Sequence, residues 1–307
     1  MRAINRWVVA STLLFLSLEC MARTRDADAV PQQLLARLMA GKEGAIALLD
    51  VSSGKLLSHW RLDVAAKRLS PPGSTVKPFV LIDLLRSGKV QPDQRLVCRR
   101  VLQIDGRQMN CSHSPSITNL DAAEAIAFSC NSYFAAIATR LNASELTEIF
   151  QRAGFASLTG FAQNEAEAAG RIASAKTPAQ LQLQSMGSWG IEVTPLALLR
   201  AYRTLALKRQ SDSSGPASAV FVGLENSVRY GMAQAAQPTG VSAAGKTGTA
   251  ADPKTGQTHG FFAGYSPADK PEIVLVIYLE HGRGRDAAAI AAPIFTSYRA
   301  STHRGKK

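Results

Sequence analysis

The sequence predicts an α+β fold with one antiparallel β-sheet and helices packed on it. Hairpin-like strand patterns lie near both ends of the 307-residue chain, and the segments between them have helical spacing. Strands at the two ends with helices between them are typical of an antiparallel sheet covered by helices. A composition of 46% hydrophobic and 19% charged residues is ordinary for a globular protein.

Residues 1–22 have the pattern of an export signal. Two arginines precede the apolar run 7–18, which is too short for an ordinary membrane-spanning helix. Small residues at the two positions that a signal peptidase reads predict cleavage after Ala22. The alternatives are a lipid-anchored Cys20, which Glu19 disfavours, and an uncleaved membrane anchor. In each case we expect the rest of the chain to be exported to the cell envelope or periplasm.

The first strands are expected to form a hairpin after a polar linker. Residues 23–43 are polar and charged, with a short helix around Pro31–Met39. The apolar run Gly44–Asp50 predicts a strand, residues 52–55 a turn, and Leu56–Trp60 the returning strand.

The middle of the chain is predicted to be helical. A helix over Ser74–Leu85 follows Pro71-Pro72-Gly73, because prolines and glycine favour the start of a helix over its interior. The apolar spacing of Asp121–Leu141 is also helical, but Ser129-Cys130-Asn131 interrupts it with residues that favour caps and turns. The other predicted helices are Ser144–Ala153, Pro178–Met186, Pro195–Leu207 and Glu225–Ala235, with a surface loop at Gln210–Ser218.

The periodicity changes near the C-terminus, where strands return. The expected elements there are strands at Gly245–Ala250, Gly260–Ser266 and Glu272–Glu280, turns over 252–257 and 267–271, a helix from Ala287 to about Ala300, and a basic tail over 301–307.

Three short motifs point to a chemistry. They are Ser74-Thr75-Val76-Lys77, Ser129-Cys130-Asn131 and Lys246-Thr247-Gly248. Each alone occurs by chance in many chains. All three in this order, widely separated, are typical of serine enzymes that form acyl intermediates with peptides or β-lactams.

Ser74 is the candidate nucleophile and Lys77 its candidate base. A serine hydroxyl reacts poorly until a neighbouring base takes its proton. Positions i and i+3 share a helix face, so the Lys77 amine is within reach of the Ser74 hydroxyl. The amine must be neutral to act as a base, and burial or a second cation, for which Lys246 is the candidate, lowers a lysine pKa. Without the other motifs, a helix N-cap with an exposed lysine is the preferred interpretation.

The cysteines allow more than one interpretation. Cys98 and Cys111 flank a short polar segment that contains the turn signal Asp105-Gly106. In an oxidising compartment we expect these two cysteines to form a disulfide, worth about 3 kcal/mol on the chain-entropy model. The alternatives are free thiols or a metal site that adds His113 and Asp105, for which no fourth ligand is obvious. Cys130 is interpreted as a small core residue, and no metal or cofactor is expected.

The net charge of +12 suits an anionic lipid surface or an anionic wall polymer as well as nucleic acid. No basic stripe with interleaved aromatic residues occurs, and the densest basic cluster is the C-terminal tail. Nucleic acid is therefore not an expected partner.

From about Gly44 to Pro293 the chain resembles the transpeptidase domain of the penicillin-binding proteins, especially the monofunctional class that builds septal or side-wall peptidoglycan. The resemblance implies an antiparallel sheet with helices on both faces and an inserted all-helical subdomain, within a domain over residues 44–300. The matching segments are Pro72–Pro78, Ser129–Phe134, Val193–Ala197, Gly245–Ala250 and His259–Tyr265.

The resemblance implies roles for the first two motifs. Ser74 is expected to be acylated, with Lys77 as its base. Ser129 is expected to relay a proton toward the leaving amine, and Asn131 to hold the peptide amide of the substrate.

It also implies roles for the third motif. Lys246 and Thr247 are expected to bind the substrate carboxylate, and Gly248 to leave room for substrate along the strand edge. The backbone N–H groups of Ser74 and Thr249 are expected to form the oxyanion hole. The implied substrate is a peptidoglycan stem peptide ending in D-Ala-D-Ala, and β-lactams would acylate the same serine.

Other functions remain open at this point. A serine β-lactamase would need a deacylating base, for which Glu165 and Glu167 are candidates. A D,D-carboxypeptidase would use the same motifs, and a β-lactam sensor or a scaffold that binds wall peptide would not turn over. The chain also departs from the family at Gly187-Ser188-Trp189, where the family usually has Gly-x-Gly. A compact, stand-alone acyl-enzyme domain is the expectation, because only about twenty residues separate the export signal from the first strand.

Overall fold

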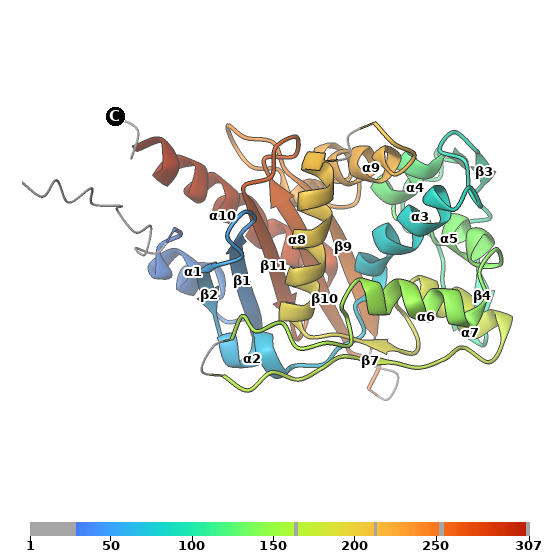
Figure 1. Ribbon diagram of the computed structural model, residues 1–307, viewed down its shortest axis with the longest axis horizontal. Helices are drawn as coiled ribbons and strands as arrows, with labels where there is room; N and C mark the ends of the chain where they lie inside the picture. Colours follow the sequence, from blue (N-terminus) through green and yellow to red (C-terminus); the bar gives the residue numbers. More distant parts are fainter. Residues whose placement is uncertain (1–28, 163–164, 212–213, 252–254, 305–307) are drawn as a thin grey trace, which may run out of the picture.

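The computed structural model describes residues 29–162, 165–211, 214–251 and 255–304 (Figure 1). The expected export signal over 1–22 lies outside these residues. In chain order the elements are α1 (Gln32–Leu38), β1 (Gly44–Asp50), β2 (Leu56–Trp60), α2 (Leu62–Lys67), the 3₁₀ helix η1 (Gly73–Val76), α3 (Lys77–Arg86), β3 (Leu96–Val97), β4 (Gln103–Ile104), β5 (Arg107–Gln108), β6 (Asn119–Leu120), α4 (Ala122–Ala127), α5 (Asn131–Ala138), α6 (Ala143–Arg152), β7 (Arg171–Ile172), α7 (Pro178–Ser185), β8 (Ile191–Glu192), α8 (Pro195–Ser211), α9 (Ser218–Arg229), the 3₁₀ helix η2 (Gln234–Ala236), β9 (Ala244–Ala251), β10 (Thr258–Ser266), β11 (Ile273–Leu279) and α10 (Gly284–Arg304).

A five-stranded antiparallel sheet forms the centre of the fold. Its order is β2-β1-β11-β10-β9, so the N-terminal hairpin lies beside the C-terminal strands. Gly44 of β1 and Gly260 of β10 both pair with Leu279 of β11. The prediction of a single main antiparallel sheet built from both ends of the chain is confirmed, and β9 lies at one edge of it.

The sheet separates two hydrophobic cores. Along β11, Val274 and Val276 enter the larger core, whereas Leu275 and Ile277 enter the smaller one. This alternation follows from the period of two along a strand. Helix α8 packs on the first face, and α1 and α10 pack on the second (Figure 1). Helices therefore cover both faces, as the resemblance implied.

A mostly helical region lies beside the edge strand β9. It contains α3 to α7 and α9, drawn at the right of Figure 1. Helix α4 packs on α9, α9 packs on β9, and η1 also contacts β9. The boundary between the sheet and the helical region thus runs along β9, which carries the third motif.

Some predicted elements differ from the structure. The expected helix Glu225–Ala235 is α9, which begins earlier and ends at Arg229. A Cβ at Gly231 would lie 2.3 Å from the carbonyl oxygen of Ala127, so the chain turns there against the end of α4. The C-terminal helix α10 runs through Arg304, beyond the predicted end near Ala300.

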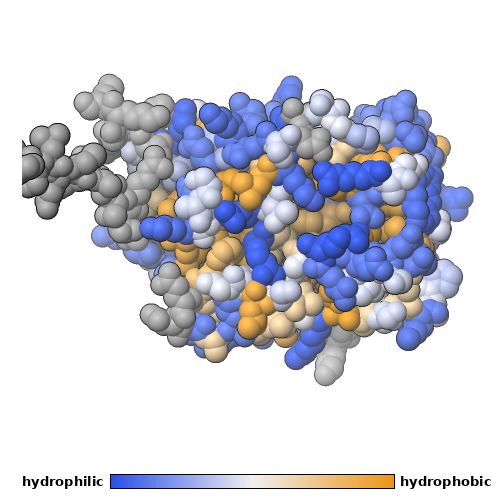
Figure 2. Space-filling view, in the orientation of Figure 1, coloured by the Kyte–Doolittle hydropathy of each residue, from blue (hydrophilic) through white to orange (hydrophobic). Residues whose placement is uncertain are grey.

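The surface is largely hydrophilic on the face that Figure 2 shows, with hydrophobic groups between the polar ones. Within the described part of the chain, every helix is too short or too polar to cross a membrane.

Candidate active site

Ser74 lies in a tight turn at the edge of the sheet. The turn η1 is a 3₁₀ helix, and α3 begins only at Lys77, so the expectation that an α-helix starts at Ser74 is corrected by one turn. Gly73 has a φ of 54°, and a Cβ there would lie 2.8 Å from the carbonyl oxygen of Thr249. Only glycine fits this conformation in this space. Close packing against β9 therefore fixes the position of the nucleophile.

Lys77 joins the first motif to the second. Its side chain is 0% exposed, and Nζ donates to the carbonyl oxygen of Ser129 at 2.9 Å, to Ser129 Oγ at 3.3 Å and to Asn131 Oδ1 at 2.6 Å. Among the hydrogen bonds of the described residues, none joins Lys77 to Ser74. Burial lowers the pKa of Lys77 to about 8. The amine can therefore be neutral near physiological pH, as a general base requires.

The second motif lies at a break between two helices, as predicted. Helix α4 ends at Ala127, and α5 begins at Asn131. Ser129 occupies the left-handed region with a φ of 53°, which is uncommon for a residue other than glycine. The Cys130 N–H donates to the carbonyl oxygen of Ala125 at 3.1 Å. The turn presents Ser129 and Asn131 together to the Lys77 amine.

The third motif lies on β9. Lys246 is 0% exposed, and its Nζ donates to the carbonyl oxygen of Thr247 at 3.1 Å. Burial, followed by the nearby charge of Lys77, lowers the pKa of Lys246 well below its usual value. The two lysines are therefore close enough for their charges to repel. We expected Lys246 to lower the pKa of Lys77, but burial is what lowers it, and the repulsion lowers the pKa of Lys246 instead.

Gly248 brings β9 against the nucleophile turn. A Cβ at this position would lie 2.3 Å from the carbonyl oxygen of Pro72 and 2.9 Å from Thr75 Cγ2. The glycine is therefore required for packing, in addition to any room it leaves for substrate. Next to it, Thr249 is exposed, and its Oγ1 accepts the N–H of Gly284 at 2.9 Å. The start of α10 thereby supports this end of the strand.

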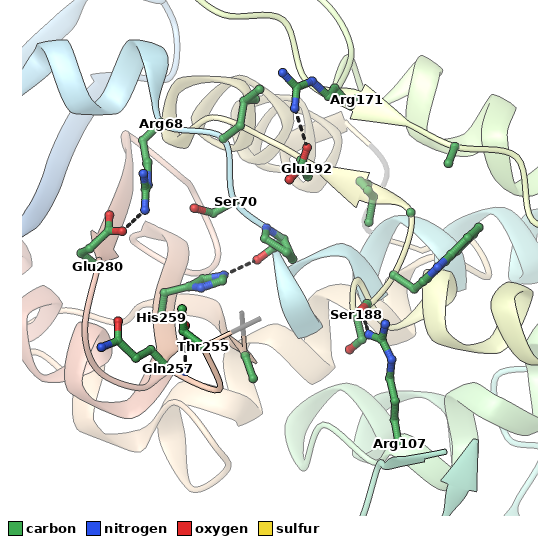
Figure 3. A pocket seen from close by; sticks show the side chains of 17 residues that line it. Arg68, Ser70, Arg107, Arg171, Ser188, Glu192, Thr255, Gln257, His259 and Glu280 are labelled. Atoms are coloured by element: carbon green, nitrogen blue, oxygen red, sulfur yellow. Dashed lines mark hydrogen bonds and ion pairs between the residues drawn. The ribbon is translucent and has the colours of Figure 1, made fainter. Parts of the chain in front are cut away.

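A cavity of about 610 Å³ lies beside the nucleophile turn (Figure 3). His259 Nε2 donates to the carbonyl oxygen of Pro71 at 2.9 Å and forms part of its wall. Arg107 reaches across from the β4–β5 hairpin and donates to the carbonyl oxygen of Ser188 at 2.8 Å. Trp189, where the sequence departs from the family pattern, lines the cavity and packs partly on the core. His259 begins a segment that resembles the family, but sequence reasoning did not predict that His259 or Arg107 lines a cavity.

The two glutamates considered as deacylating bases have other partners. Glu165 is exposed and pairs with Lys67 at 2.9 Å. Glu167 accepts hydrogen bonds from the backbone N–H groups of Thr159, Gly160 and Ala162. Both side chains therefore stabilise the loop after α6 and its contact with α2, which is a structural role.

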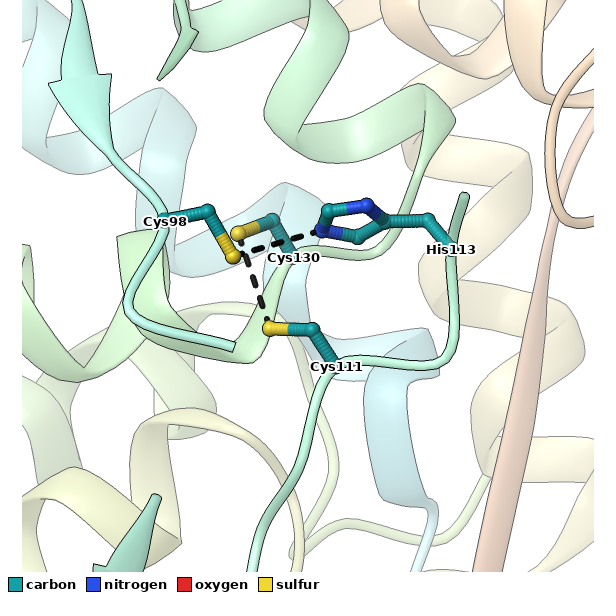
Figure 4. A group of neighbouring side chains, drawn as sticks. All are labelled: Cys98, Cys111, His113 and Cys130. Atoms are coloured by element: carbon teal, nitrogen blue, oxygen red, sulfur yellow. Dashed lines mark hydrogen bonds between the residues drawn. The ribbon is translucent and has the colours of Figure 1, made fainter. Parts of the chain in front are cut away.

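The expected disulfide between Cys98 and Cys111 is absent. All three described cysteines are free thiols. Cys98 Sγ lies 3.5 Å from His113 Nε2, and Cys111 Sγ lies 3.8 Å from Cys130 Sγ (Figure 4). Both sulfurs instead lie as free thiols in one group with His113 and Cys130, whose ligand atoms are all within 4.8 Å of one another. Sequence reasoning placed Cys130 in the core as a separate residue and missed that it completes this group.

Comparison with known proteins defines the family. Residues 37–298 match the penicillin binding protein transpeptidase domain, so the chain belongs to this family. A stretch of 38 residues is 53% identical to the peptidoglycan D,D-transpeptidase MrdA of Acinetobacter baumannii, covering 12% of this chain and 6% of the length of that relative.

Solved structures share the fold. The transpeptidase domain of Burkholderia pseudomallei penicillin-binding protein 3 has a TM-score of 0.76 at 20% identity, covering 92% of this chain and 97% of that chain. Pseudomonas aeruginosa PBP2, solved in complex with WCK 5153, has a TM-score of 0.74 at 21% identity, covering 88% of this chain and 76% of that chain. The D,D-transpeptidase domain from Eggerthella lenta has a TM-score of 0.75 at 20% identity, covering 90% of this chain and 81% of that chain.

Proposed function

We propose that this protein is a penicillin-binding serine D,D-transpeptidase that acts on D-Ala-D-Ala stem peptides in peptidoglycan synthesis. The observation that carries the proposal is the convergence of the three motifs. Lys77 hydrogen-bonds both polar residues of the second motif, and Lys246 of the third motif lies near enough to repel it. Family membership supports the same activity.

The proposed acylation starts at Ser74. Its Oγ forms a bond to the carbonyl carbon of the penultimate D-Ala, and Lys77 takes the hydroxyl proton. The backbone N–H groups of Ser74 and Thr249 stabilise the oxyanion. The C–N bond to the terminal D-Ala then breaks, and Ser129 relays the proton to the leaving amine. An acceptor amine attacks the ester and restores the serine.

The remaining motif residues are assigned to substrate binding. The terminal carboxylate is assigned to Lys246 and Thr247, because a cation and a hydroxyl are suited to an anion. Asn131 is assigned to the peptide amide of the substrate. Its Nδ2 donates to the carbonyl oxygens of Met109 at 3.1 Å and Asn110 at 3.4 Å, and its Oδ1 accepts from Lys77, so the side chain is held in one orientation.

The proposed site of action is the cell envelope, with the protein exported by residues 1–22 and either released or tethered there. The net charge of +12 supports proximity to anionic lipid or wall polymer. Stem peptides are the proposed substrate, and β-lactams the proposed covalent inhibitors.

Exchange with a synthetic stem pentapeptide tests this function. The protein is incubated with the peptide and a labelled D-amino acid, and the products are separated by mass. We expect release of D-Ala together with incorporation of the label, both lost in Ser74→Ala. Release without incorporation would instead identify a D,D-carboxypeptidase. Stable acylation by penicillin with neither product would identify a sensor or a binding scaffold.

A further inference from the structure

Four buried metal-ligating side chains converge next to the second motif. Cys98 follows β3, Cys111 and His113 follow β5, and Cys130 lies between α4 and α5 (Figure 4). Their exposed fractions are 8%, 7%, 3% and 0%. One ligand atom from each lies within 4.8 Å of the other three. Segments separated along the chain therefore bring three sulfurs and one imidazole nitrogen to one point.

The spacing of these atoms fits a tetrahedral metal ion. With Zn–S bonds of about 2.3 Å and a Zn–N bond of about 2.0 Å, a tetrahedral zinc ion separates two sulfurs by about 3.8 Å and a sulfur and a nitrogen by about 3.5 Å. The observed separations are 3.8 Å between Cys111 Sγ and Cys130 Sγ, and 3.5 Å between Cys98 Sγ and His113 Nε2. A disulfide would need two sulfurs at about 2.05 Å.

The groups around the cluster suit bound thiolates and a neutral imidazole. His113 Nδ1 lies 3.2 Å from the carbonyl oxygen of Ser114, which can only accept, so Nδ1 carries the proton and Nε2 presents its lone pair to the cluster. Backbone N–H groups of Arg100 and Ser132 donate to Cys98 Sγ and Cys111 Sγ, each at 3.4 Å. Such N–H···S contacts stabilise negative charge on sulfur.

A cation also lies beside the cluster. The Arg100 guanidinium donates to the carbonyl oxygens of Cys111 at 3.4 Å, His113 at 2.9 Å and Ser114 at 3.0 Å. Three thiolates, a neutral imidazole and a divalent ion carry a net charge of about −1, which an adjacent guanidinium partly offsets. Arg100 also fixes the backbone that carries two of the four candidate ligands.

We propose that Cys98, Cys111, His113 and Cys130 bind one Zn²⁺ ion in a closed structural site. Binding displaces the three thiol protons, and the four ligands fill the coordination shell without water. The expectation that the chain binds no metal is therefore replaced. Asp105, considered above as a ligand, is exposed at the turn of the β4–β5 hairpin and is not part of the cluster.

The proposed ion would position the second motif. Cys130 lies between Ser129 and Asn131, and the Asn131 side chain donates to the carbonyl oxygens of Met109 and Asn110, next to Cys111. One metal ion bound by both Cys111 and Cys130 would hold the 98–113 loop against the turn that carries Ser129. The zinc ligands are then positioning residues for acylation, a consequence that rests on the proposed function, whereas metal binding itself does not.

Metal content of the full chain, purified under reducing conditions without added metal, tests the site. We expect about one zinc ion per chain in the wild type. Cys98→Ser, Cys111→Ser and His113→Asn should each lose most of it. Asp105→Asn and the exposed His59→Asn are matched controls and should retain it. Zinc that persists in all three ligand variants, or wild-type protein without stoichiometric zinc after incubation with equimolar Zn²⁺, would overturn the proposal.

Cobalt exchange in the wild type tests the ligand set without relying on a folded variant. Replacement of zinc by Co²⁺ should give intense visible bands of a tetrahedral ion with thiolate charge-transfer absorption. Pale octahedral bands would overturn the assignment. So would an intramolecular disulfide among these cysteines, detected by intact mass in freshly isolated protein.

Chelation and metal return separate the positioning role from folding. Removal of zinc with a chelator in the presence of a reductant should slow acylation by penicillin at least tenfold, and equimolar Zn²⁺ should restore the rate. Unchanged acylation in verified zinc-free protein would reject the positioning role. If zinc is bound but no acylation occurs at any metal content, the proposed function fails while the metal site stands.

Discussion

Lys77 Nζ lies 2.6 Å from Asn131 Oδ1, and this short hydrogen bond joins the first motif to the second inside the protein. The Lys77 side chain is fully buried and also contacts Ser129. Because an amine without water must find its partners within the protein, the second motif determines where the candidate base is held. The two motifs therefore act as one unit, and changing either should affect the same chemical step.

Lys77→Ala should reduce the rate of acylation by a fluorescent penicillin by roughly 10² to 10⁴, the usual contribution of a general base. Lys77→Arg should fail as well, because a guanidinium does not deprotonate in proteins. Lys67→Ala is the matched control, since Lys67 is exposed and pairs with Glu165. An acylation rate within twofold of wild type in Lys77→Ala, with the fold intact by circular dichroism, would remove Lys77 from the mechanism.

Acylation should rise with pH as Lys77 loses its proton. Burial lowers the pKa of Lys77 to about 8, so the amine is mostly protonated below that pH and mostly neutral above it. The neutral form is the base, and its fraction increases about tenfold per pH unit on the acid side. Stopped-flow acylation should therefore increase up to about pH 8 and then level off. A rate that falls over this range, in protein that stays folded, would contradict the assigned base.

Lys246→Ala should weaken acylation more moderately. Lys246 is buried near Lys77 on β9, and the proposal assigns it to the substrate carboxylate. A hydrogen bond to a charged group is worth about 1.5–3 kcal/mol, which corresponds to a decrease of roughly 10- to 100-fold in the second-order rate constant. The exposed Lys270→Ala serves as the control. If Lys246→Ala lowers the rate constant equally for a substrate that lacks the carboxylate, Lys246 does not act by binding that carboxylate.

Several strands and the break at Ser129 could be predicted from sequence because they depend on local patterns. β1 and β2 have the predicted bounds, since apolar runs end at turn residues on both sides. The family fold follows from the three motifs. These features require no knowledge of what packs against them.

Other features depend on distant packing and could not be predicted. Helix α9 is displaced because Gly223 within it and Gly231 just after it let the chain approach α4, where a Cβ would meet the carbonyl oxygens of Ala123 and Ala127. The strand pairs β3–β6 and β7–β8 have two residues per strand, too few for a periodic signal. The structure holds Cys98 and Cys111 as free thiols, and their spacing in the sequence did not show that both would join His113 and Cys130 in one cluster.

Glu165→Gln and Glu167→Gln should leave the lifetime of the penicilloyl adduct nearly unchanged. Glu165 pairs with Lys67, and Glu167 accepts backbone N–H groups of its own loop. Glu167→Gln should instead lower the unfolding temperature, because a glutamine has only one acceptor oxygen for those donors. Adduct lifetimes measured by gel should fall in minutes to hours for all three proteins. Fast nitrocefin turnover that either substitution abolishes would establish a β-lactamase.

Covalent labelling of Ser74 by a fluorescent penicillin tests the central claim most directly. The protein is incubated with the reagent, digested and sequenced by mass spectrometry, with Ser74→Ala and the neighbouring Ser70→Ala as a matched pair. The account predicts one adduct, on the peptide that contains Ser74, present in wild type and Ser70→Ala and absent in Ser74→Ala. Labelling that survives in Ser74→Ala, or an adduct on another residue, would contradict it.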